Sequence, residues 1–406
     1  MAAEGSFAPA LRPGLLLSNA RFRLLWSARA ISFVGDGIAT IALLLYVKAQ
    51  SASGLTVATL LLAVTVPRLL GPVAGTLADR VAATRLMISC DLGQALVFTL
   101  VAATLPPLPL LLPLVALAST LATLFRPAGS SLIPRFVAAE QLIAANAWVG
   151  LALNLQIVLG PPLGGAAFEV LGIRGALAVN ATTFVASAVL LSRLSVPPLR
   201  ASSTAPAAFL TDLRQGLSFV FGDSVLRIVV TTLFASVLFA AVDNVALVFL
   251  ARDDLHASPV GYGVTAGAFG VGMVAAALIL TGVKRTSSAL AVYLSGLVLN
   301  GAGTLATGLA TGIPVAAAAQ FCAGAGNGAD NVGGDTVVQQ QAPPELLGRA
   351  FGIVGASAVL GASLASLLGG GLVELTSART TFLVGGAGVL ASAVPAALLA
   401  WRSSRR

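Results

Sequence analysis

Seven ionisable side chains lie inside long apolar segments of the chain, where each of them needs a partner. They are five aspartates and two arginines: Asp36, Asp91, Asp243, Asp330, Asp335, Arg29 and Arg68. A charge in nonpolar surroundings is unfavourable unless a countercharge, a hydrogen bond or water accompanies it. The chemistry open to such carboxyl groups is the binding and release of protons.

The deepest of these groups is Asp36. Arg29 and Asp36 are seven residues apart, so a helix places them two turns apart on one face. At 1.5 Å per residue, Asp36 lies about 20 Å from the start of its apolar segment. It is our first candidate for the acid that couples proton movement to another process. The alternative is a permanently paired structural acid.

Arg68 and Asp91 extend this group. If their helices are neighbours, the two residues differ by about 6 Å in height, a distance that an arginine side chain can span. With Arg29 and Asp36 they are predicted to form one inner network, which could serve structural pairing or proton relay. The full set of proton-coupling candidates is Asp36, Asp243, Asp91, Arg29, Arg68 and Asp330.

Other chemistries lack their residues. His256 is the only histidine, and one histidine makes neither a zinc site nor a nucleophile–histidine–acid set. Cys90 and Cys322 both fall in apolar segments, which argues against a disulfide framework. The chain has no GxxxxGK[ST] phosphate loop, and GVGMVA at 270–275 lies in a continuous apolar run. We therefore expect no enzyme activity, no cofactor and no metal.

The composition shows what must position the buried acids. Of 406 residues, 57% are hydrophobic and 9% are charged. A soluble domain carries roughly 25% charged residues, so this chain could not cover a water-facing surface. Its low-charge stretches are about 20 residues long, enough to cross a bilayer as helices. We predict an all-α membrane protein with twelve transmembrane helices, at about 24–47, 55–77, 86–106, 108–126, 146–168, 174–194, 225–249, 260–282, 287–309, 313–335, 350–372 and 380–401.

The basic residues predict the orientation of these helices. If both chain ends are cytoplasmic, 17 basic residues fall on the cytoplasmic side: Arg12, Arg21, Arg23, Arg80, Arg85, Arg126, Arg135, Arg193, Arg200, Arg214, Arg227, Lys284, Arg285, Arg349, Arg402, Arg405 and Arg406. Only 4 fall on the other side: Lys48, Arg174, Arg252 and Arg379. The positive-inside rule then predicts a multi-pass plasma-membrane protein with both termini in the cytoplasm. The net charge of +8 is therefore a topology signal and implies no nucleic-acid partner.

The two halves of the chain repeat each other. An offset of 207 pairs Asp36 with Asp243; it also pairs Ser51 with Ser258, Gly54 with Gly261, Val57 with Val264 and Gly75 with Gly282. An offset of 205 pairs Glu169 with Glu374 and Arg174 with Arg379, and Glu140 with Glu345. We predict two six-helix halves, 1–194 and 225–406, related by pseudo-symmetry.

Residues 195–224 are predicted to link these halves on the cytoplasmic side. The segment begins with VPPL and a polar run, and it ends with FLTDLRQGLSFVF. In that last part, apolar residues recur at helical spacing, as in a helix that lies on a membrane surface. The alternative is a simple tether.

Residues 157–165 read IVLGPPLGG and place poor helix formers inside an apolar run. Gly160 and Gly164 form a GxxxG pair beside Gly165, and small residues let membrane helices approach closely. Pro161 and its neighbouring proline favour a bend. We predict a bent, tightly packed helix at an interface between the halves. A purely structural kink is the alternative.

A second motif, GTLADRVAATR at 75–85, follows the second predicted helix. It carries Gly75, Asp79, Arg80 and Arg85. Asp79 can reach the following arginines, or a helix N-terminus in the other half, where an anion is favoured. Such a charge clasp would hold one face shut during a conformational change. The alternative is an ordinary solvated charge cluster.

These motifs resemble the major facilitator superfamily. GPPLGG matches the GPxxGG core of the helix-5 signature associated with its proton-coupled exporters, with Gln156 where the longer signature usually has glycine. GTLADRVAATR resembles the superfamily loop G-x-L-a-D-R-x-G-R-R. The resemblance extends over nearly the whole chain, to the macrolide-efflux and enterobactin-exporter-like branch, through RFRLLWSARAISFVGD, FRPAGSSLIPRFVAAEQLIAANAW, TDLRQGLSFVFGDSVLR and QQQAPPELLGRAFG.

The resemblance implies a proton-coupled exporter, an antiporter of amphiphilic small molecules such as antibiotics or siderophore-like metabolites. Its partners would be the small-molecule substrate, protons and the lipid bilayer, and we expect a monomer. Two alternatives stay open: an importer or facilitator of the same fold, and a membrane sensor that does not transport.

Overall fold

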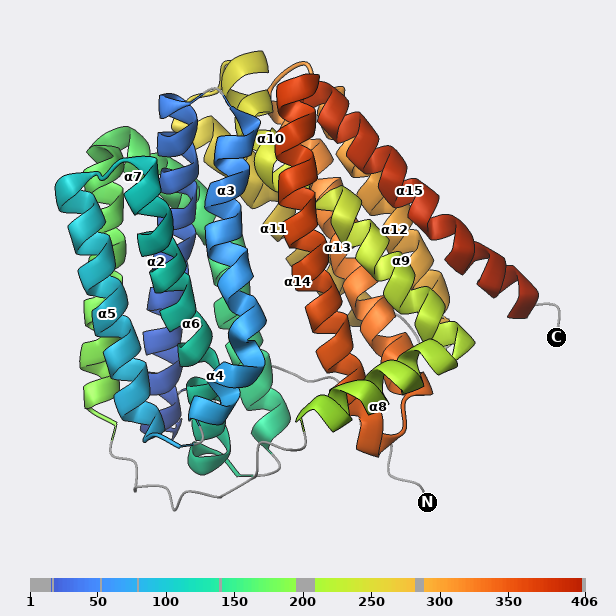
Figure 1. The fold of residues 1–406 in the computed structure, drawn as a ribbon, viewed down its shortest axis with the longest axis horizontal. Coiled ribbons are helices and arrows are strands. Elements are labelled where there is room, and N and C mark those ends of the chain that lie inside the picture. Colours follow the sequence, from blue (N-terminus) through green and yellow to red (C-terminus); the bar gives the residue numbers. More distant parts are fainter. Residues whose placement is uncertain are drawn as a thin grey trace.

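The computed structural model describes residues 16, 18–51, 53–78, 80–138, 141–194, 209–281 and 288–403. In this part of the chain every regular element is a helix. The helices before residue 195 form one bundle and those after residue 222 form another, side by side (Figure 1). We call these the N-terminal and C-terminal bundles.

The N-terminal bundle contains seven helical elements within the described residues. They are α2 (Ala20–Gln50), α3 (Gly54–Thr65), η1 (Val66–Leu70), α4 (Gly71–Ala78), α5 (Ala83–Thr104), α6 (Leu108–Phe136) and α7 (Leu142–Ser192). Gly172 adopts a positive φ of 67° and divides α7 into two helical segments. Both ends of α7 lie at the lower end of the molecule in Figure 1, so the chain turns back at Gly172. Only glycine adopts such a backbone conformation without strain.

The C-terminal bundle follows a short separate helix, α8 (Phe209–Gly222). Its elements are α9 (Ser224–Ala240), α10 (Asp243–Phe249), the π-helix η4 (Leu250–Asp254), α11 (Pro259–Thr281), α12 (Ala289–Gly308), α13 (Ile313–Gln341), α14 (Pro344–Leu375) and α15 (Ala378–Ser403). Helix α8 coincides with the predicted amphipathic segment, and its Val220 is buried against Leu226 and Val338. The rest of the predicted linker before it, 195–208, lies outside the described residues.

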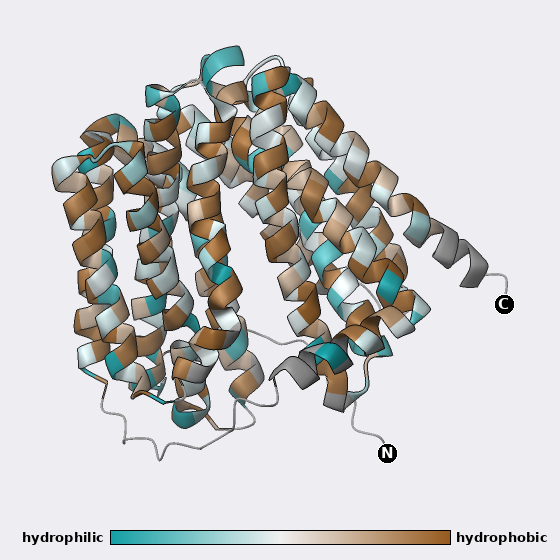
Figure 2. Cartoon of the chain, in the orientation of Figure 1, coloured by the Kyte–Doolittle hydropathy of each residue, from teal (hydrophilic) through white to brown (hydrophobic). Residues whose placement is uncertain are grey.

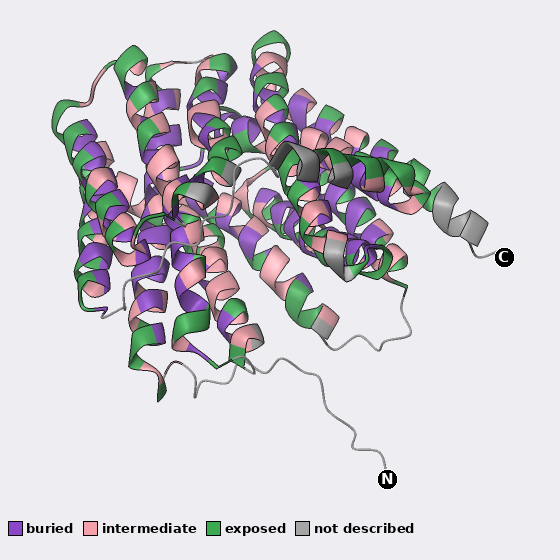
Figure 3. Cartoon of the chain, turned by 60° about the horizontal axis from the view of Figure 1, so that its bottom comes forward, coloured by how far each residue is buried: buried purple, intermediate pink, exposed green. Residues whose placement is uncertain are grey.

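Eight helices in the described part of the chain are long and apolar enough to cross a membrane. Figure 2 shows hydrophobic residues along the middle of the bundles, and many hydrophilic residues at their ends. Exposed residues lie on the outer faces, and buried ones lie where helices face each other (Figure 3). Large apolar side chains are exposed, including Val170 at 80% and Leu96 at 71%. A lipid environment explains such a surface, and this is the predicted all-α membrane architecture. The count of twelve crossings stays a prediction.

Side-chain caps set the start of several helices. Asn19 accepts a hydrogen bond from Phe22 N at the start of α2, at 3.0 Å. Asp223 accepts from Val225 N and Leu226 N at the start of α9, at 2.9 and 2.8 Å. These caps satisfy amide groups that have no partner within the helix.

The internal repeat is visible in the contacts. Arg174 donates to the carbonyl oxygens of Ala102 and Ala103 at the end of α5, at 3.1 and 2.5 Å. Arg379 donates to Gly308 and Ala310 at the end of α12, at 3.1 and 2.8 Å. A cation at a helix C-terminus is favourable because the free carbonyls carry partial negative charge. The predicted pair Arg174–Arg379 therefore has the same role in both bundles.

The structural repeat follows an offset of 205 rather than 207 at the ends of the first helices. Glu169 accepts a hydrogen bond from Val260 N of α11, and its counterpart Glu374 accepts one from Leu55 N of α3. Leu55 and Val260 are 205 residues apart, so the predicted pairs Ser51–Ser258 and Gly54–Gly261 are out of step with these contacts by two residues. The predicted pair Asp36–Asp243 has the same two-residue excess, and these two residues line different cavities.

The two bundles meet closely at the end of the molecule that carries the α2–α3 connection and η4, the upper end in Figure 1. Lys48, near the end of α2, forms an ion pair with Asp253 in η4. A Cβ on Gly370 of α14 would lie 2.7 Å from the Gly54 carbonyl oxygen, so glycine is needed for this approach. We call this end the closed end.

Candidate functional site

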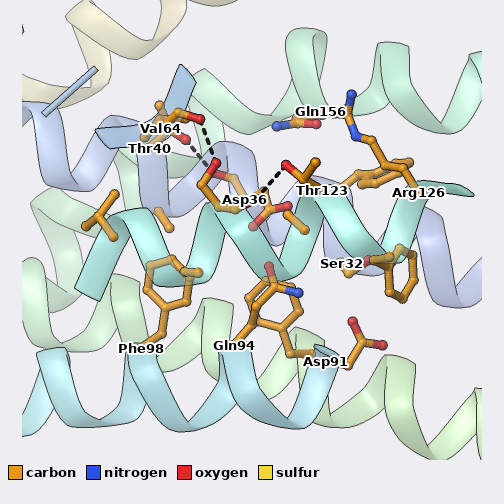
Figure 4. Close-up of a pocket in the computed structure, with 18 of the residues that line it drawn as sticks. Ser32, Asp36, Thr40, Val64, Asp91, Gln94, Phe98, Thr123, Arg126 and Gln156 are labelled. Atoms are coloured by element: carbon orange, nitrogen blue, oxygen red, sulfur yellow. Dashed lines mark hydrogen bonds between the residues drawn. The ribbon is translucent and has the colours of Figure 1, made fainter. Parts of the chain in front are cut away.

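A small cavity of about 80 Å³ lies inside the N-terminal bundle and is lined by charged side chains. Helix α2 contributes Asp36, η1 contributes Arg68, α5 contributes Asp91 and α6 contributes Arg126. Figure 4 shows Asp36, Asp91 and Arg126 around this space, together with Gln94, Thr123 and Gln156. We call it the charged cavity. It brings together three of the four residues of the predicted inner network.

Arg29, the fourth member of that network, lies elsewhere. Its side chain is buried, and the guanidinium packs over the Phe33 ring, with its carbon 5.6 Å from the ring centre. Within the described residues its Nε and Nη1 atoms have no hydrogen-bond partner. Gly129 of α6 faces it, and a Cβ there would lie 3.2 Å from Nη1. Arg29 therefore packs against an aromatic face beside the cavity and makes no ion pair with Asp36 in this part of the chain.

Arg126 corrects the sequence analysis, which assigned it to the cytoplasmic side. The predicted helix ended at residue 126, but α6 continues to Phe136. Arg126 therefore lies ten residues inside the helix, about 15 Å from its end at 1.5 Å per residue. Its charge acts directly on Asp36 and on Arg68. The signal that could have revealed it is the run AGSSLI at 128–133, which contains no charge.

Asp91 is the most enclosed acid of the charged cavity, at 1% exposure. Ser187 of α7 lies beside it. Neither carboxylate oxygen makes a hydrogen bond of normal geometry within the described residues. A buried carboxylate without partners is costly, so Asp91 is a group whose state must depend on the water or proton in this cavity.

A second, larger cavity of about 470 Å³ lies between the two bundles. It is lined by α2 and α7 from the N-terminal bundle and by α9 to α13 from the C-terminal bundle. Most of its wall is apolar, and five carboxamides interrupt it: Gln156, Asn244, Asn300, Gln320 and Asn327. Asp243 is the only charged residue in its lining. We call it the interbundle cavity.

The carboxyl group of Asp243 is held at the wall of this cavity by Gln320. The Gln320 Nε2 atom donates to Asp243 Oδ2 at 3.0 Å. The other oxygen, Oδ1, has no hydrogen-bond partner among the described residues, and neither has Gln320 Oε1. Sequence reasoning missed Gln320, since nothing in a single sequence pairs residues that are 77 positions apart.

Asp330 lies in neither cavity. It is 5% exposed, and Asn300 Nδ2 donates to its Oδ2 at 3.4 Å. The contact between α12 and α13 encloses it: a Cβ on Gly296 would lie 2.7 Å from the Asp330 Cα. Its environment is that of a structural acid in a helix–helix contact.

The helix-5 motif packs α7 against both bundles. A Cβ on Gly160 would lie 2.6 Å from the Gly37 Cα, and one on Gly164 would lie 2.9 Å from the Ile38 carbonyl oxygen. On the other side, Gly165 adjoins the Pro259 carbonyl group of α11. Helix α7 stays helical through Pro161 and its neighbouring proline. The predicted tight packing at an interface between the halves is present, without a break at the prolines.

The loop motif is described in part. Gly75 lies in α4, and a Cβ there would meet nothing within 4 Å. Arg80 lies in the turn after α4, where its N atom donates to the Leu77 carbonyl oxygen at 3.1 Å. Arg85 lies in the first turn of α5 and is exposed. Asp79, the centre of the predicted clasp, lies outside the described residues.

Comparison with known proteins gives this architecture a family. The model of the transmembrane secretion effector family matches residues 8–404. The MFS-type transporter YfiS of Bacillus subtilis is 28% identical over 373 residues, which cover 89% of each chain. Macrolide efflux protein A of Streptococcus pyogenes is 21% identical over 385 residues, 92% of this chain and 94% of that one.

A solved structure shares the fold. The peptide transporter POT in complex with sulfate superposes with a TM-score of 0.77 at 15% sequence identity, and 95% of each chain is covered. At that identity the likeness concerns the arrangement of helices alone. With the family model spanning the chain almost end to end, the chain belongs to the transmembrane secretion effector family of major facilitator transporters, and it is a transporter rather than an enzyme.

Proposed function

We propose that the chain is a proton-coupled exporter of amphiphilic small molecules, acting as a monomer with both termini in the cytoplasm. Its two halves, 1–194 and 225–406, would move against each other about the linker 195–224. The observation that carries the proposal is the pairing of two cavities. A charged cavity adjoins a larger, mostly apolar one, so protons and cargo have separate sites.

The charged cavity is the proposed proton site. Asp36 faces it from α2, and Arg126 and Arg68 supply positive charge around it. When Asp36 loses its proton, these guanidinium groups stabilise the carboxylate; when it gains one, the cavity gains net positive charge. That difference lets protonation bias one conformation over another. Each proton that crosses a membrane potential of 100 mV supplies roughly 2.3 kcal/mol.

The interbundle cavity is the proposed cargo site. Its volume of about 470 Å³ falls within the usual 300–1,000 Å³ range of small-molecule pockets. Apolar residues from both bundles would hold the hydrophobic body of the cargo. The carboxamides and Asp243 would satisfy its polar groups, because an unpaired polar group in such a site is costly.

The direction of transport is proposed to be outward. Two features support export: the GPxxGG core of α7, packed between α2 and α11, and the printed function of the relative macrolide efflux protein A. The same packing lets α7 respond to movements of both bundles. It does not depend on which cargo is bound.

The test uses purified protein reconstituted in vesicles with an imposed pH gradient. Erythromycin, a macrolide, is the first probe, and ethidium is a second amphiphile of different shape. Cargo movement against the proton gradient, abolished by a protonophore, supports the proposal. Movement of both probes in the same direction as protons, or movement unaffected by the gradient, contradicts it.

A further inference from the structure

One residue belongs to the walls of both cavities and comes with an unused functional group. Gln156 of α7 lines the charged cavity and the interbundle cavity, and only Thr40 of α2 shares this position in both linings. Figure 4 shows the Gln156 side chain among the residues of the charged cavity. Position 156 also departs from the helix-5 signature, which usually has glycine there.

The packing of α2 against α7 places Gln156 next to the proton site. Gly37 directly follows Asp36, and a Cβ on Gly37 would lie 2.8 Å from the Gln156 carbonyl oxygen and 3.5 Å from its Cγ. Because Gly37 and Gly160 both lack side chains, the two backbones approach closely enough for this contact. The side chain of Gln156 therefore begins one residue away from Asp36.

The carboxamide of Gln156 is available for new hydrogen bonds. Thr40, in contrast, already donates its hydroxyl proton to the Asp36 carbonyl oxygen at 2.8 Å. Gln156 is partly exposed to the cavities, and its amide makes no hydrogen bond of normal geometry within the described part of the chain. A carboxamide offers two donor hydrogens and one acceptor oxygen. It can therefore turn toward the charged cavity or toward the interbundle cavity.

We propose that Gln156 is the positioning residue that links cargo to proton in this transporter. Without cargo, its amide serves the water and carboxylate of the charged cavity; polar groups of bound cargo draw it into the interbundle cavity. Asp36 then loses a hydrogen-bonding neighbour, and a proton passes between its carboxyl group and cavity water. Gln156 itself never carries the proton. The inference rests on the proposed function, because it requires Asp36 as the proton site.

The experiment separates binding from coupling. Erythromycin is added to detergent-purified protein in weakly buffered solution, and proton release is followed with a pH-sensitive dye. Binding of the same probe is measured by equilibrium dialysis. The variants are Gln156→Leu, which keeps similar size without polar atoms, Gln156→Asn, which keeps a shorter amide, and Thr40→Val, the matched control in the same wall.

In Gln156→Leu, erythromycin-induced proton release should fall at least about fivefold, the lower end of usual coupling between two sites, while binding changes less. Gln156→Asn should recover part of the release, and Thr40→Val should resemble the wild type. Normal proton release by Gln156→Leu would overturn the inference, as would a loss of binding and release in equal proportion. If Gln156→Leu does not fold, normal release by Gln156→Asn and by Gln156→Gly would overturn it equally. Absence of release from the wild type would contradict the proposed function, and this inference with it.

Discussion

Glu169 and Glu374 make the same hydrogen bond in opposite directions across the interface between the bundles. Glu169, on α7, accepts from Val260 N at the start of α11, at 3.1 Å. Glu374, on α14, accepts from Leu55 N at the start of α3, at 3.5 Å, and from the Ser53 hydroxyl at 2.8 Å. Each bundle thus supplies a carboxylate to a helix N-terminus of the other, where an anion is favoured.

Replacing both glutamates by glutamine should loosen the closed end, because a neutral amide is a weaker partner for a helix N-terminus than a carboxylate. Pulsed electron paramagnetic resonance between spin labels on Thr59 of α3 and Leu368 of α14 measures the separation. We expect longer and broader distances in the double variant than in either single variant. Arg174→Gln, which removes a contact within one bundle, is the control. Wild-type distances in the double variant would show that these carboxylates do not hold the end closed.

Asp36→Asn should abolish proton-driven efflux and leave folding and membrane insertion intact. The change removes the group that binds the proton and keeps a side chain of the same shape. Efflux in vesicles with an imposed pH gradient is the measurement, and size-exclusion chromatography checks the fold. Asp330→Asn is the matched control, since Asp330 lines neither cavity. Normal gradient-driven efflux by Asp36→Asn would assign coupling to another acid.

Arg126→Gln should lower gradient-driven efflux about as far as Asp36→Asn does. The two groups share the charged cavity, and the charge of Arg126 acts on Asp36. In a double variant the losses should not add, because residues that act as a unit are strongly non-additive. The same efflux assay on both single variants and the double variant decides this. Independent, multiplying losses would mean that Arg126 and Asp36 serve different steps.

Gly164→Leu should impair export by separating α7 from α2. A Cβ at this position would already lie 2.9 Å from the Ile38 carbonyl oxygen and from the Ile41 Cβ. Overpacking of this kind costs typically 1–3 kcal/mol, which either shifts the helices or lowers the amount of folded protein. Export is compared at matched expression with that of Gly150→Leu, whose position meets nothing within 4 Å. Equal export by the two variants would mean that α7 tolerates separation from α2.

Asp79→Asn should reduce turnover more than cargo affinity. A charge-assisted contact in a clasp is worth about 1.5–3 kcal/mol to one conformation, and its loss shifts the population of the others. Erythromycin binding in detergent and transport in vesicles are measured on the same preparation. Distances between the bundles near α4 and α14 should change together with transport. Lost transport with an unchanged distance distribution would give Asp79 a role other than a clasp.

Much of the architecture follows from local pattern. Apolar length predicts the helices, and the glycines of 157–165 predict a tight contact, because backbone approach depends on residue size alone. Asp36, Arg68 and Asp91 could be grouped from their heights along neighbouring helices. All three do line one cavity.

The rest depends on information that one sequence does not carry. Arg126 was misplaced because a span of minimal length reaches only to residue 126, whereas α6 extends ten residues further. Gln320 and Gln156 gain their roles only from the packing of helices that are distant in sequence. The repeat was read at 207 near Asp36, because identical residue types coincide there. The contacts of Leu55 and Val260 require 205.

The ion pair between Lys48 and Asp253 joins residues that are themselves 205 positions apart, the offset of the structural repeat. Each therefore meets its own counterpart, as residues on a two-fold axis do. Two copies of the N-terminal half would place lysine against lysine at this point, and two copies of the C-terminal half would place aspartate against aspartate. Like charges in contact disfavour such pairs. The position therefore makes each half select the other over itself, which a duplicated chain could do only after its two copies had diverged here.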